Sequence, residues 1–193
     1  MNLLLSIRNY LVFNALLAIG VAGCAALPAP GPAEGGFNLR GKIGVVQGSE
    51  SFSARLLWQQ RGDAFDIDLW GPLGQGRVRL SGAGNYLELT DADGSVLDRG
   101  PADAVMTRNL GWSLPLTVLP YWVRGRPAPR LAVADEIRDE ADRLAGFAQL
   151  DWRVELDRYA AVADGASEQY LPNRITARRG DARVRLAVSR WQF

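Results

Sequence analysis

Apolar and polar residues alternate along most of the chain after residue 36, which is the pattern of β-strands with one buried face. Turn signals rich in glycine and aspartate separate these runs, and Gly180-Asp181 is a two-residue loop of the kind that closes hairpins. The pattern predicts an antiparallel meander with one apolar face. The alternating runs occupy residues 54–59, 64–70, 77–80, 86–90, 150–156, 174–178 and 183–188.

The middle of the chain departs from this alternation and predicts two short helices inserted in the sheet. Pro101 stands where a first helical turn tolerates proline, and Gly111 stands where a helix ends. For the second helix we expect Thr117 as the N-cap, Pro120 within the first turn and Gly125 at the end.

The sequence pattern alone leaves the class of residues 133–147 open. Apolar residues recur there at helical spacing, and Asp139 with Arg143 has the i,i+4 spacing of a favourable helical ion pair. The segment nevertheless lies between predicted strands, and the pattern does not decide between helix and strand.

Composition excludes several classes of function. The 193 residues, 48% of them hydrophobic, suit one domain with a real core, and a net charge of +1 gives no global attraction to nucleic acid. The absence of histidine excludes a Ser-His-Asp triad and the commonest zinc sites. No phosphate-cradling loop of the Walker type is present, so we expect no nucleotide hydrolysis. We also expect no cofactor and no metal.

The N-terminal segment predicts a lipid anchor. Residues 1–23 contain a short apolar run, too short for a membrane-spanning helix, that is typical of a secretory signal. The run closes with V-A-G-C, and Cys24 is the only cysteine in the chain. We interpret Cys24 as an acyl attachment point, residues 24–36 as a Pro/Gly tether and residues 37–193 as the single folded domain.

Two carboxylates are the best enzymatic candidates. Asp66 and Asp68 share one strand face, ~7 Å apart at ~3.3 Å per residue, which would suit an acid and a base in glycoside hydrolysis. The same spacing is expected on the solvated face of an amphipathic strand. Both interpretations stay open at this stage, with the solvated face favoured.

Six runs, taken in order, are distinctive: F-N-L-R-G-K-I-G-V (37–45), W-Q-Q (58–60), D-L-W-G-P-L-G-Q-G-R (68–77), L-G-W-S-L-P-L (110–116), Y-W-V-R-G-R-P (121–127) and L-P-N-R-I (171–175). Together they resemble the LolB family of outer-membrane lipoprotein receptors, and V-A-G-C resembles a lipobox. The likeness extends through nearly the whole mature chain and is least close over residues 128–148.

The resemblance implies an incomplete, strongly curved antiparallel β-barrel with short helices covering its open side and an apolar cavity inside. It also favours a loop followed by a strand for residues 133–147. It implies a monomer anchored through Cys24 to the periplasmic face of the outer membrane. Alternation combined with this fold places Leu56, Trp58, Ile67, Leu69 and Trp152 on the cavity lining.

The resemblance also implies a function without catalysis. The cavity would receive the acyl chains of a lipoprotein from a LolA-like periplasmic carrier and release them into outer-membrane lipid. Leu73, held between Pro72 and Gly74 on the family's protruding loop, would take part in delivery to the membrane. The alternatives are a lipid-anchored hydrolase that uses Asp66 and Asp68, and a structural lipoprotein with a filled core.

Overall fold

The structure is a computed structural model that describes residues 36–71, 74, 76–165 and 167–193. All of them belong to one compact unit, which excludes residues 1–31 and contains every core residue described below. The elements are β1 (Phe37–Gln47), β2 (Glu50–Arg61), β3 (Ala64–Trp70), β4 (Val78–Ala83), β5 (Tyr86–Thr90), β6 (Val96–Pro101), α2 (Ala102–Leu110), α3 (Leu119–Trp122), β7 (Ala134–Arg138), β8 (Leu144–Gln149), β9 (Trp152–Asp164), β10 (Ser167–Arg179) and β11 (Ala182–Gln192).

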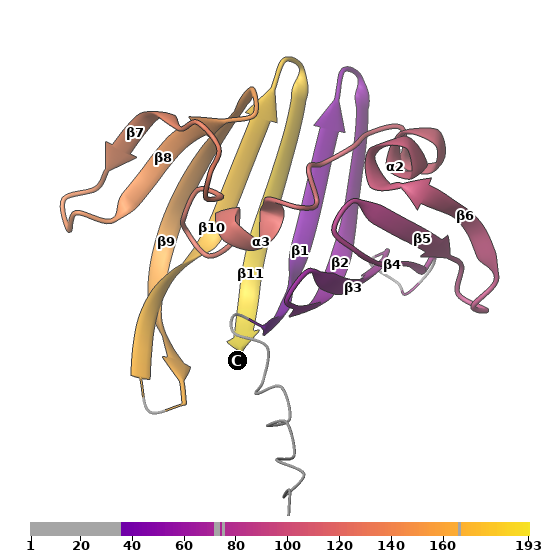
Figure 1. Ribbon diagram of the computed structural model, residues 1–193, viewed down its shortest axis with the longest axis horizontal. Helices are drawn as coiled ribbons and strands as arrows, with labels where there is room; N and C mark the ends of the chain where they lie inside the picture. Colours follow the sequence, from indigo (N-terminus) through magenta and orange to yellow (C-terminus); the bar gives the residue numbers. More distant parts are fainter. Residues whose placement is uncertain (1–35, 72–73, 75, 166) are drawn as a thin grey trace, which may run out of the picture. The chain divides into compact units, whose positions relative to one another are not determined.

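The strands form one 11-stranded antiparallel sheet in the order β6-β5-β4-β3-β2-β1-β11-β10-β9-β8-β7 (Figure 1). The first and last strands of the chain's β-structure, β1 and β11, pair at the centre, while β6 and β7 are the two edges. The sheet is therefore open, as the predicted incomplete barrel requires. The mainly antiparallel β fold with few helices is confirmed.

The predicted alternation corresponds to the two faces of this sheet. Ala54, Leu56 and Trp58 on β2 are buried, whereas Arg55 between them is exposed. The buried side chains form one continuous core on the face that we call the inner face. The hairpin between β10 and β11 turns at Gly180-Asp181, as predicted.

Both predicted helices are present, and the second is shorter than expected. Helix α2 follows Pro101 directly and ends at Gly111, whose φ of 75° is the left-handed conformation that glycine adopts at low cost. Helix α3 covers only Leu119–Trp122, and its N-cap is Val118. The assignment of Thr117 as N-cap is wrong, because the 3.0 Å bond from the Val118 amide to the Pro115 carbonyl already turns the chain before α3.

The segment at 133–147 contains strands. Residues 134–138 form β7 and residues 144–149 form β8, which pair as an irregular hairpin. The Asp139–Arg143 pair exists, with 2.8 Å between Asp139 Oδ2 and Arg143 Nη2, but it spans the turn of the hairpin. The family expectation of a strand here was right, while the preceding residues are a short edge strand instead of a loop.

Candidate functional site

An apolar cavity of about 60 Å³ lies between the inner face of the sheet and the segment that contains both helices. The sheet side of its lining comes from β1–β4, β10 and β11. The other side comes from α2 and residues 112–123; we call residues 102–128 the helical cover. Every lining side chain is apolar, so the interior offers dispersion contacts and no hydrogen-bond partner.

The structure brings together most of the residues predicted for the lining. Leu56, Trp58, Ile67 and Leu69 all line the cavity. Trp152 does not: it is 1% exposed at the start of β9, with its ring centroid 6.4 Å from that of Trp122. Trp122, which lines the cavity, packs against Trp152, and alternation along β9 alone does not reveal this contact.

The cavity is small because the helical cover fills most of the interior. Leu114, Leu116 and Trp122 of the cover are 7%, 7% and 0% exposed. A cavity of roughly 150 Å³ is needed to hold a single benzene ring, so 60 Å³ does not admit a fatty-acyl chain. In this conformation the sheet and its cover form a closed apolar core.

A buried glutamine fastens the cover to the sheet. Gln149 at the end of β8 is 2% exposed, and its Oε1 accepts hydrogen bonds at 2.9 Å from Trp122 Nε1 and from the Ala128 amide. Its Nε2 donates to the Ala128 carbonyl at 2.9 Å. The sequence does not indicate a role for Gln149, because a polar residue at a strand end has no distinguishing pattern.

Arg124 ties the cover to the start of β1. Its Nη2 donates to the Gly36 carbonyl at 3.2 Å, and the guanidinium lies 4.9 Å from the ring centroid of Phe37. Burial, together with the nearby charge of Arg126, lowers the pKa of Arg124. The cation is thus held in a partly apolar site at the end of the cover.

The last turn of the cover packs closely against β9. Gly125 has a φ of 74°, and a Cβ there would lie 2.8 Å from the hydroxyl oxygen of Tyr159. That hydroxyl donates to the Leu144 carbonyl at 2.6 Å, and burial raises the pKa of Tyr159 to about 12. Both the backbone conformation and the close approach require glycine at this position.

The turn after β3 is described only in part. The Gly74 amide donates to the Gly71 carbonyl at 3.0 Å, and Gly74 has a φ of 81°, a conformation that glycine adopts at low cost. Pro72 and Leu73 lie outside the described residues, as does the proposed acyl site, Cys24. Their assigned roles stay predictions.

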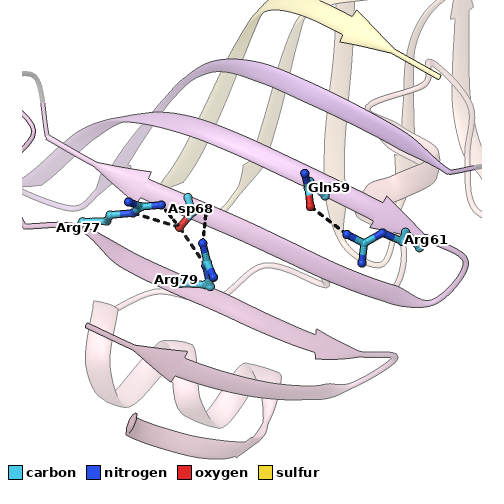
Figure 2. Close-up of polar contacts among 5 residues, drawn as sticks. All are labelled: Gln59, Arg61, Asp68, Arg77 and Arg79. Carbon is cyan, nitrogen blue, oxygen red and sulfur yellow. Dashed lines mark hydrogen bonds and ion pairs between the residues drawn. The ribbon is translucent and has the colours of Figure 1, made fainter. Parts of the chain in front are cut away.

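Asp66 and Asp68 lie on the outer face of the sheet, away from the apolar cavity. Asp68 is 6% exposed and receives hydrogen bonds from Arg77 and Arg79 at 3.0–3.2 Å (Figure 2). Burial raises the pKa of Asp68, but the hydrogen bonds and charges of Arg79 and Arg77 outweigh it, so the pKa lies below its usual value. A carboxylate so held is a poor proton donor, and the geometry does not favour the hydrolase.

Within the described parts of the chain, acidic side chains do not gather into a group that could hold a metal ion. A search of those same residues for a helix long and apolar enough to cross a membrane found none.

Comparison with known proteins defines first the fold class and then the family. The chain superimposes on a LolA superfamily protein from Nitrosomonas europaea with a TM-score of 0.54 over 82% of this chain and 86% of that one, at 11% sequence identity. The two therefore share a fold. Residues 36–191 match the family described as outer membrane lipoprotein LolB, and the chain belongs to that family.

Curated relatives agree with this assignment. The outer-membrane lipoprotein LolB of Marinobacter nauticus is 38% identical over 161 residues, covering 81% of this chain and 74% of the relative. That of Stutzerimonas stutzeri is 36% identical over 198 residues, covering 91% and 92% of the two chains. The resemblance inferred from the sequence motifs is confirmed, and the protein is a member of an outer-membrane lipoprotein family.

Proposed function

We propose that this protein accepts lipoproteins from a LolA-like periplasmic carrier, shelters their acyl chains between sheet and helical cover, and inserts them into the outer membrane. The observation that carries the proposal is the wholly apolar lining of the interior. An acyl chain of ~15 methylenes favours such a site over water by ~12 kcal/mol. Transfer between two apolar sites needs only an affinity difference, so it requires neither a nucleotide nor a catalytic residue.

The closed interior means that the helical cover moves when cargo enters. The polar contacts that fasten the cover at Gln149 contribute only about 0.5–1.5 kcal/mol each. Apolar side chains of the displaced cover would remain in contact with the acyl chain. Opening therefore exchanges one set of apolar contacts for another, and cargo binding is able to drive it.

Anchoring through Cys24 on the periplasmic face forms part of the same proposal. The acyl chains on that cysteine would hold the domain at the membrane through the 24–36 tether. A Cys24→Ala chain should incorporate no radiolabelled palmitate and should leave the membrane fraction. Labelling that persists in this variant would contradict the assignment.

Leu73 is proposed as a local membrane probe beside the acceptor domain. One leucine leaving water contributes only ~1.5–3 kcal/mol, so it perturbs the leaflet without anchoring the protein. Leu73→Glu should slow delivery of cargo to vesicles while leaving acyl binding unchanged. Delivery at the normal rate would show that the turn residue is incidental.

The acceptor proposal is tested by filling the interior in a form that starts at residue 25. Ala177 lines the cavity and Ala54 does not, although both lie on the inner face and each is 5% exposed. Ala177→Leu should weaken binding of a fluorescent fatty-acyl probe at least tenfold, because the added carbons occupy the site. Ala54→Leu, with a similar overpacking cost of ~1–3 kcal/mol, should bind the probe like the parent.

A second candidate, a structural lipoprotein with a permanently filled core, is favoured by the small volume of the cavity. The same experiment separates the two functions. A structural lipoprotein would not take up the probe in its parent form. Equal probe binding by Ala177→Leu and Ala54→Leu would mean that the probe binds outside the cavity, which would also contradict the acceptor proposal.

A further inference from the structure

The outer face of the sheet carries a second hollow, of about 500 Å³, on the central strands. Three cations from β1 and β2, namely Arg40, Lys42 and Arg55, line it together with Trp70 from the end of β3. We call these four residues the outer basic patch. Lys42 is the only lysine in the chain. The apolar surface beside the cations comes from Leu57 and Trp70.

The charges of the patch are not neutralised by the rest of the described protein. Lys42 and Arg55 are exposed cross-strand partners, an arrangement that costs stability because like charges stand directly opposite each other. Within the described residues, no carboxylate forms an ion pair with Arg40, Lys42 or Arg55. On β10, by contrast, two arginines of the outer face have acidic partners: Arg174 pairs with Asp157 at 3.0 Å, and Arg178 pairs with Glu155.

The nearest carboxylate on the neighbouring strand is already occupied. Asp68 on β3 lies directly opposite Leu57 on β2. Its carboxylate already binds Arg77 and Arg79, so two positive charges face one negative charge. A net charge of +1 for the whole chain therefore conceals a local excess of positive charge at this point. The arrangement is complementary to a surface that carries several negative charges.

The backbone beneath the patch is built for a close approach of β1 and β11. Gly41 stands between Arg40 and Lys42, and a Cβ there would lie 2.4 Å from the carbonyl oxygen of Ala187. The register of β1 against β11 shifts at the same point. The irregularity lies directly between the two β1 cations and shapes the floor of the hollow.

We infer that the outer basic patch docks on phosphate groups of an anionic phospholipid surface. Cations beside the half-buried indole of Trp70 are a combination that suits a bilayer interface, where tryptophan lies at headgroup level and lysine or arginine meets phosphate. In the sequence, Trp70 is followed within three residues by Leu73, the proposed membrane probe. Docking would thus orient the domain with β1–β3 toward the membrane. This inference concerns orientation and is independent of acyl binding.

The test measures co-sedimentation of the form that starts at residue 25 with lipid vesicles and no cargo. The parent should bind vesicles containing phosphatidylglycerol much better than pure phosphatidylcholine vesicles, and salt should weaken that binding. The double variant Lys42→Gln/Arg55→Gln should bind the anionic vesicles about 30-fold more weakly, which corresponds to about 1 kcal/mol for each cation.

A matched control removes the same charge elsewhere. Arg99 on the edge strand β6 and Arg130 before β7 are exposed, and among the described residues neither side chain has an ion pair. Arg99→Gln/Arg130→Gln should therefore bind anionic vesicles nearly like the parent. If this control loses as much vesicle binding as the patch variant, the binding depends on net charge alone and the inference is overturned.

Other outcomes would also overturn it. One is equal binding of the parent to neutral and anionic vesicles. Another is a patch variant that keeps vesicle binding but loses binding to the LolA-like carrier, which would make the outer face a protein interface. Because the assay contains no acyl cargo, failure here leaves the acceptor proposal intact, and failure of the acyl-probe assay leaves this inference intact.

Discussion

The inner and outer faces of the same sheet carry opposite kinds of side chain, apolar on one and charged on the other. On the inner face, side chains from β1–β4, β10 and β11 meet the helical cover in a continuous apolar core. On the outer face, cations and carboxylates pair along the flanks, while the centre carries the uncompensated outer basic patch. The period-2 geometry of the strands allows one chain to form both kinds of face at once.

This difference separates what holds the domain together from what is free to recognise other molecules. Side chains of the inner face form the core that stabilises the fold. In the acceptor proposal they also contact acyl chains when the helical cover moves. The outer face contributes little to the core, so its charges can be arranged for an external partner at a small cost in stability. Substitutions on the two faces should therefore differ in both the size and the kind of their effects.

The largest expected effect comes from the inner face. Trp122→Ala should lower the free energy of unfolding by about 3–5 kcal/mol, because it empties a fully buried site and removes the donor to Gln149. Tyr170→Ala, at a site that is 58% exposed, should cost about 0.5 kcal/mol or less. Urea unfolding measures both. A similar loss in the two variants would mean that the cover contributes little to the core.

The next-largest effect is expected at Asp68, which Arg77 and Arg79 bind on the outer face. Asp68→Asn should destabilise the protein by about 1–2 kcal/mol, less than a fully buried pair, because Arg77 and Arg79 are half-exposed and can turn to water. Asp66→Asn is the matched control: its side chain is 39% exposed and lies 3.7 Å from Arg61, so less than about 0.5 kcal/mol is expected. If the two variants are equally stable, the cluster has no structural role.

The Asp68 cluster also predicts how the stability of the protein depends on pH. Because the folded-state pKa of Asp68 lies below its usual value of 3.8, the unfolded chain binds a proton more readily than the folded one. The stability contributed by Asp68 is thus complete above the unfolded pKa and is lost as the pH falls through the folded pKa. The difference in stability between the parent and Asp68→Asn should be constant near pH 7 and should shrink below about pH 4. A difference that grows in acid would contradict the sign of this shift.

Much of the fold could be predicted because one face is uniformly apolar. Strands such as β2 and β11 alternate in the sequence as they do in burial, and α2 is bounded by proline and glycine. Strand β7 had no such signal, because all five of its residues are exposed and it is held only by irregular pairing with β8. The short α3 depends on packing of Trp122 more than on its cap, and the sequence pattern overestimated its length.

The site was less predictable than the fold because it depends on contacts between distant segments. Alternation assigns Trp152 to the inner face correctly, yet it packs against Trp122, 30 positions away, and does not line the cavity. The burial of Asp68 had a readable signal: arginines at 77 and 79 share the same side of the next strand, with Arg79 directly opposite Asp68. The interpretation of a merely solvated carboxylate overlooked that pairing.

The smallest expected effect lies within the outer basic patch, where one substitution should change stability and vesicle binding in opposite directions. Lys42→Glu places a carboxylate opposite Arg55, so a repulsive cross-strand pair becomes attractive and the protein should gain about 0.2–1 kcal/mol in unfolding free energy. The neutral variant Lys42→Gln should gain about half as much. In vesicle binding the order should reverse, with the glutamate variant weakest, because it turns a cation of the patch into an anion. A variant that is both more stable and still bound to anionic vesicles would show that the like-charged pair serves no lipid contact.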